Sequence, residues 1–143
     1  MITVDYEDVF HLSYWRATQR TLEGVPFLNA FYSNFLATSP EVSEKFSETN
    51  FDALMRMLSI SLVHVAKYSS ARRPDALLKV LAERHSQKDL DIRPDLYDHW
   101  MEALIETVKT YDPQYEDGTG EGWRRVLGPG VDYMKSRYAT SSE

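Results

Sequence analysis

Apolar residues recur every three or four positions along most of this chain, which is the spacing of an amphipathic α-helix. No segment shows the alternation of apolar and polar residues that is typical of a strand. The helices expected from this pattern cover residues 5–21, 26–38, 51–69, 74–85, 94–111 and 121–138, with a short helix at 40–46. The pattern therefore predicts an all-α fold with six main helices and one short helix, packed as a bundle or as a sandwich.

Prolines and glycines mark the ends of these segments. Pro40, Pro74 and Pro94 can each open a helix, because the first helical turn does not need the N–H group that proline lacks. Residues 112–122 are rich in Asp, Glu and Gly, and we expect them to form the main loop. Pro129 stands between two glycines inside the last segment and is expected to kink that helix.

Length and composition narrow the class of protein. A chain of 143 residues can bury a sizeable core, and we expect one domain over 1–143 with a flexible tail at 139–143. The formal charge of -6, from 16 Lys+Arg and 22 Asp+Glu, argues against nucleic acids and anionic membranes as partners. Without cysteine there is no disulfide and no thiolate metal site. Since no apolar run spans a membrane and no signal peptide is evident, a soluble cytoplasmic protein is expected.

One histidine stands at the end of an apolar helix face. Leu77, Leu81 and His85 are spaced by four residues and so share a stripe. A neutral imidazole beside apolar surface can bind a metal, although a single histidine at such a place is more often a packed or half-exposed residue of the core. The stripe alone therefore leaves both interpretations of His85 open.

Further residues stand in a definite order before and after His85. They are Phe31-Tyr32-x-x-Phe35, then Ser39-Pro40-Glu41-Val42 and Phe46, and, after His85, Ile92-Arg93-Pro94-x-x-Tyr97. This order resembles the globin family, and within it the single-domain bacterial globins, the globin heads of haem-based oxygen sensors and the globin domains of flavohaemoglobins. The resemblance extends from about Val25 to Tyr138. It implies a globin-like helical sandwich around a pocket for haem b, whose iron is the metal that His85 would bind.

The resemblance assigns roles around the iron. His85 matches the proximal iron ligand, and Phe46 matches the phenylalanine that packs on the haem face. The residues expected to contact haem are Phe46, Leu54, Leu58, Leu81, Ile92 and Tyr97. Tyr97 matches a tyrosine near the proximal histidine of flavohaemoglobin-like globins, where a glutamate late in the last helix completes the network. That glutamate has no clear counterpart here, because Glu143 lies in the tail and Asp132 is not an obvious substitute.

The opposite, distal side of the haem is expected to carry a tyrosine. Tyr32 matches a tyrosine that, in bacterial globins, donates its hydroxyl to iron-bound oxygen. Because bound oxygen carries partial negative charge, this bond would contribute roughly 1.5–3 kcal/mol. The alternative is a buried tyrosine that bonds to a backbone carbonyl. We therefore expect the bound gas to contact Tyr32, Leu54 and Leu58.

The helical register of 51–69 decides which residues face that side. The register that fits best turns Phe51, Leu54 and Leu58 inward, and it turns Arg56 and His64 away. It predicts a distal side without histidine. His64 would be an internal sixth ligand of the iron only in a different register.

Reversible binding of oxygen, and of nitric oxide and carbon monoxide, is the function that the resemblance implies, in a carrier, store or sensor. An alternative is a nitric oxide dioxygenase, an enzyme that would need a separate reductase. A second alternative is a haem-free helical interaction module. A sensor would need a signalling partner. Either a monomer or a homodimer fits, the latter through the last two helices, where Trp123 and Tyr133 would add apolar surface.

Overall fold

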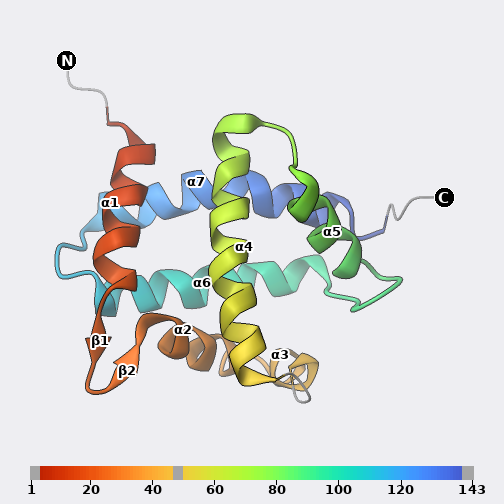
Figure 1. The fold of residues 1–143 in the computed structure, drawn as a ribbon, viewed down its shortest axis with the longest axis horizontal. Helices are drawn as coiled ribbons and strands as arrows, with labels where there is room; N and C mark the ends of the chain where they lie inside the picture. The colour runs from red at the N-terminus through yellow and green to blue at the C-terminus, as the bar shows by residue number, and fades with distance from the viewer. Residues whose placement is uncertain (1–3, 47–49, 140–143) are drawn as a thin grey trace.

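The computed structural model describes residues 4–46 and 50–139, and most of these residues are helical (Figure 1). The helices are α1 (Tyr6–Thr18), α2 (Phe27–Leu36), α3 (Pro40–Lys45), α4 (Phe51–Ala71), α5 (Ala76–Arg84), α6 (Pro94–Tyr111) and α7 (Asp117–Ser136). The predicted all-α class, with six main helices and one short helix, is confirmed.

A small hairpin precedes α2, and the expectation that the chain has no strand was wrong at this point. Strand β1 (Thr21–Leu22) pairs antiparallel with β2 (Val25–Pro26). The two residues of the turn, Glu23 and Gly24, have φ angles of 50° and 84°. Such left-handed pairs form the two-residue turns whose twist matches that of a hairpin. The strands are too short to show an alternating pattern, which is why the sequence did not indicate them.

Side-chain caps explain where several helices begin. Asp75 accepts a hydrogen bond from the Leu78 amide (2.9 Å), so α5 begins after Asp75 and not at Pro74. The expected start of the last helix at residue 121 was also wrong. The Glu116 and Thr119 side chains cap each other's backbone amides, and this capping box starts α7 at Asp117. The loop after α6 is correspondingly shorter.

The helices form two crossing layers (Figure 1). Helices α1 and α4 lie in front of α6 and α7 and run across them, while α2 and α3 pack near one end of α4 and α5 near the C-terminal part of α7. Helix α7 continues through Pro129 to Ser136. A Cβ atom on Gly122 would lie 2.7 Å from Val9, and one on Gly130 would lie 2.6 Å from the carbonyl oxygen of Val65. These two glycines therefore let α7 pass directly beneath α1 and α4.

Trp123 belongs to the core and has no exposed surface. Its ring meets Phe10 edge-on at a centroid distance of 4.9 Å, and its Nε1 donates to the Ser13 hydroxyl (2.8 Å). The expectation that Trp123 adds surface for a second copy was wrong, because the tilted crossing of α1 over α7 covers it. Tyr133 is half-buried and stacks on Tyr68.

A buried ion pair joins α1 to the end of α6. The Asp112 carboxylate accepts from the Ser13 hydroxyl (2.6 Å) and from Nε and Nη2 of Arg16 (2.7 and 2.9 Å). Burial alone would raise the pKa of Asp112, but the bonds from Arg16 and Ser13 outweigh it and hold that pKa below its usual value.

Across the described residues, we find no helix with the length and apolar character needed to cross a membrane.

Candidate functional site

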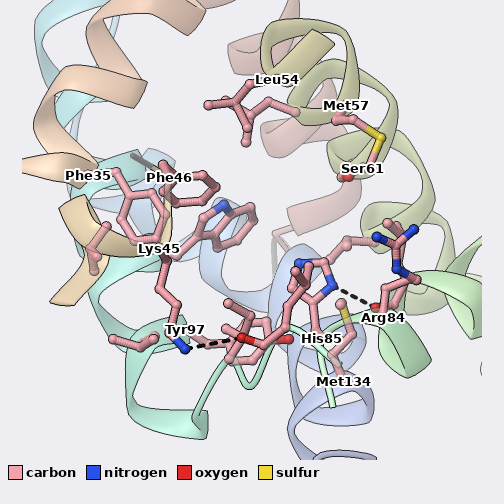
Figure 2. A pocket seen from close by; sticks show the side chains of 18 of the residues that line it. Phe35, Lys45, Phe46, Leu54, Met57, Ser61, Arg84, His85, Tyr97 and Met134 are labelled. Atoms are coloured by element: carbon pink, nitrogen blue, oxygen red, sulfur yellow. Dashed lines mark hydrogen bonds between the residues drawn. The ribbon is translucent and has the colours of Figure 1, made fainter. Parts of the chain in front are cut away.

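A cavity of about 430 Å³ opens between α3, α4, α5, α6 and α7 (Figure 2). This volume lies within the range of small-molecule and cofactor sites. Helix α4 supplies one wall, with Ala53, Leu54, Met57, Leu58, Ser61 and Val65. The other apolar and aromatic lining residues are Phe35, Val42, Phe46, Leu81, Leu90, Ile92, Leu96, Tyr97, Trp100, Val131 and Met134. The lining is therefore mainly apolar, as a site for a large hydrophobic ligand requires.

His85 reaches into this cavity from the end of α5, where it is the C-cap residue. Its Nδ1 lies 2.6 Å from the carbonyl oxygen of Leu81. Because a carbonyl only accepts hydrogen bonds, Nδ1 must carry the proton, and in the neutral ring Nε2 then keeps a free lone pair. Figure 2 shows the other edge of the ring, which carries Nε2, directed into the cavity. The imidazole is thus held in the form and orientation that a metal ligand needs.

The surroundings of His85 keep it neutral. Burial lowers the pKa of the imidazole below its usual value of 6.5 and outweighs the hydrogen bond to Leu81, which acts in the opposite direction. Among residues 4–46 and 50–139, no three His, Asp or Glu side chains gather as a metal-binding cluster. His85 is therefore a single donor in an apolar cavity. This donor set suits a metal whose other ligands come from a macrocycle, as in haem, better than a bare ion.

The structure brings the predicted haem-contact residues together. Phe46, Leu54, Leu58, Leu81, Ile92 and Tyr97 all line the cavity. Their roles toward haem stay predictions. The Tyr97 ring lies 6.4 Å from that of His85, measured between centroids, and burial raises the pKa of its hydroxyl. No described residue bonds to this hydroxyl. Asp132 is exposed, and Glu143 lies outside the described residues.

Tyr32 does not line the cavity. Its half-buried ring packs edge-on against Phe46 and Phe51, with centroid distances of 5.9 and 5.7 Å. The expectation that Phe51 faces inward was wrong: its side chain is 45% exposed. Phe51 is the first residue of α4, and it does not line the cavity. The predicted role of Tyr32 toward a bound gas stays a prediction.

The rest of the α4 register agrees with the sequence analysis. Leu54 is buried and Leu58 half-buried, and both face the cavity, while Arg56 is exposed. His64 lies off the cavity wall, and its Nδ1 is 2.6 Å from a carboxylate oxygen of Asp75. The arrangement therefore does not offer His64 as a second ligand.

Five lining residues with polar or sulfur-bearing side chains were missed, among them Met134 of α7. Met57 and Ser61 belong to α4, whereas Lys45 and Arg84 are the last residues of α3 and α5. The Lys45 ammonium donates to the carbonyl of Leu90 (3.1 Å), and Arg84 pairs with an Asp89 carboxylate (3.0 Å). Lys45 and Arg84 directly precede Phe46 and His85, and this adjacency could have indicated them.

No family model matches this sequence, and none of the curated proteins compared with it does. Among solved structures, the crystal structure of protein PA3967 from Pseudomonas aeruginosa PAO1 matches with a TM-score of 0.87. The two sequences are 34% identical over 95% of this chain and 100% of that one. PA3967 is described as structurally highly homologous to a human hemoglobin. Taken together with the crossing helical layers, this similarity shows that the chain belongs to the globin family.

Proposed function

We propose that this globin binds haem b through His85 and thereby binds oxygen reversibly. The observation that supports this most is the hydrogen bond from Nδ1 of His85 to the Leu81 carbonyl, which leaves Nε2 free toward an apolar cavity. A neutral imidazole with its second nitrogen bonded to a carbonyl is the usual arrangement of a histidine that binds a metal.

The lining residues fit the different parts of a haem group. Phe46, Leu54 and Leu58 offer apolar surface to the flat faces of the porphyrin, and Trp100 adds aromatic surface. Lys45 and Arg84 supply positive charge beside this otherwise apolar lining. There they would pair with the carboxylates of haem. When bound, haem supplies an iron with one coordination position free for a diatomic gas.

The chain's own residues would control that position. His85 would hold the iron from one side, and the apolar wall of α4 would exclude bulk water from the other side. Exclusion of water favours a reversible complex, because it keeps charged species and protons away from the bound gas. We therefore propose an oxygen carrier, store or sensor, with nitric oxide and carbon monoxide as further ligands.

The test is haem uptake by purified protein, followed by the visible spectrum, with His85→Ala compared with wild type. We expect wild type to take up one haem and to show a reversible spectral change when the reduced protein meets oxygen. His85→Ala should retain haem weakly. His11→Ala is a suitable control, since the His11 side chain is 63% exposed on α1.

A second variant separates loss of the ligand from loss of the fold. In His85→Gly, added imidazole should occupy the vacated space and restore the spectrum of the wild-type complex. A wild-type protein that takes up no haem would contradict the proposal. The same holds for a His85→Gly protein whose spectrum already equals that of wild type before imidazole is added.

A further inference from the structure

The wall of the cavity formed by α4 carries one hydroxyl group, that of Ser61. Ser61 follows Met57 by four residues and precedes Val65 by four, so it lies on the same stripe of the helix as these apolar lining residues. In Figure 2 the Ser61 oxygen points into the space that the His85 ring enters from the other side. A polar group therefore faces the proposed metal ligand across an apolar cavity.

This hydroxyl has no hydrogen-bond partner among the described residues. Hydroxyls in helices commonly bond to a backbone carbonyl one turn earlier. Thr18 and Thr107 do so here, with distances of 2.6 and 2.7 Å to the carbonyl oxygens of Tyr14 and Ala103. Ser61 makes no such bond, although it is half-buried. Its proton is available to an acceptor inside the cavity.

We propose that Ser61 donates a hydrogen bond to the gas molecule held opposite His85 and so favours oxygen over carbon monoxide. This inference rests on the proposed function and adds a specificity-determining residue to it. Oxygen gains partial negative charge when it binds ferrous iron, and a hydroxyl donor stabilises such an acceptor. Carbon monoxide is less polar in the same place and gains less.

Ser61 is better placed for this role than the tyrosine expected from the sequence. The Tyr32 ring lies beyond the cavity wall, between Phe46 and Phe51. The Ser61 hydroxyl needs no movement of a ring to reach the cavity. The experiment tests both residues. A donor role for Ser61 predicts faster oxygen release in Ser61→Ala, whereas a donor role for Tyr32 predicts it in Tyr32→Phe.

The experiment measures oxygen and carbon monoxide dissociation from the haem-loaded protein and from its Ser61→Ala variant. We expect oxygen release to be about tenfold faster in Ser61→Ala, as follows from the loss of one ordinary hydrogen bond. Carbon monoxide release should change less. The C–O stretching frequency of the carbon monoxide complex should also shift, because it reports the polarity around the bound gas.

Three further variants make the result specific. Ser59→Ala is the matched control, since Ser59 is a half-buried serine of the same helix that does not line the cavity. Ser61→Thr keeps the hydroxyl and should preserve slow oxygen release. Tyr32→Phe removes the competing donor and should leave the oxygen rate nearly unchanged.

Two results would overturn the assignment: equal oxygen rates in Ser61→Ala and Ser59→Ala, or a fast rate in Tyr32→Phe alone. A wild-type protein that shows no Soret band would instead remove the proposed function together with this inference. The two failures are distinguishable, because haem uptake is recorded before any rate is measured.

Discussion

The imidazole of His85 has two nitrogens, and the helix that carries it engages only one of them. The Leu81 carbonyl accepts both from the His85 amide (3.0 Å) and from Nδ1 (2.6 Å). A carbonyl oxygen has two lone pairs, so both bonds can form at the end of a helix, where the last carbonyls lack other partners. The orientation of this ring therefore depends on residues only four positions apart, whereas its surroundings depend on the other helices that line the cavity.

Acid should weaken the fold through His85. Because burial lowers the pKa of its imidazole, the unfolded chain binds a proton more readily than the folded chain as the pH falls below about 6.5. The contribution of His85 to stability is fully present above about pH 6.5, and it is lost as the pH falls toward the lower pKa of the folded state. The loss is at most about 1.4 kcal/mol per pH unit for one proton.

Urea unfolding of the haem-free protein at pH 7.5 and pH 5.5 measures this effect. His85→Gln, which cannot titrate, is the control and should lose less stability between the two pH values than wild type. Equal losses in the two proteins would show that His85 does not contribute to the pH dependence.

At the scale of elements, the crossing of α4 over α7 shapes the cavity. Val65 of α4 and Val131 of α7 both line it, and Gly130 lies between the two helices at this point. At Gly130 the backbone carbonyl of Val65 occupies the space in which a side chain on α7 would otherwise lie. The Gly128-Pro129-Gly130 segment, expected from the sequence to kink the helix, lies within α7 and contributes Gly130 to this contact.

Gly130→Ala should therefore be destabilising. Its Cβ would lie 2.6 Å from the carbonyl oxygen of Val65 and 2.8 Å from that residue's Cγ1, so the helices must move apart. We expect a loss of about 1–3 kcal/mol in the free energy of unfolding, measured in urea. Gly118→Ala, also in α7, meets no atom within 4 Å and should cost nothing. A Gly130→Ala protein as stable as wild type would be incompatible with the close crossing.

At the scale of the whole molecule, the two ends of the chain are joined through a polar network in the core. Asp112 binds Arg16 and Ser13, and Ser13 in turn accepts from Trp123. The network connects α1, the end of α6 and the first half of α7, and none of its residues lines the cavity. It holds the crossing layers together without any contribution from a bound group.

Asp112→Ala should lower the free energy of unfolding by about 3 kcal/mol, because it breaks a buried pair and leaves the Ser13 hydroxyl and Arg16 without an acceptor. Thermal or urea unfolding of the haem-free protein gives the value. Asp98→Ala removes an exposed carboxylate that pairs with Lys135, and its effect should be small. Similar losses in both variants would argue against a special role for the buried network.

The sequence by itself determined the features that depend on short-range order. The spacing of apolar residues predicted the helices, Pro94 marked the start of α6, and the four-residue step from Leu81 placed His85 at the end of α5. The capping box of Glu116 and Thr119 is equally local, although the glycines that follow it obscure the helical pattern. The order of Tyr32, Phe46 and His85 was enough to indicate the globin family.

The tertiary structure alone decided which side chains meet in the cavity. Ser61 and Lys45 come from different helices, and they line the same cavity as His85 only because α3, α4 and α5 converge there. For the same reason Tyr32 packs against Phe46 and Phe51 and does not line the cavity. Helical periodicity gives the direction of a side chain from its own axis, whereas the angle at which two helices cross decides what that side chain contacts.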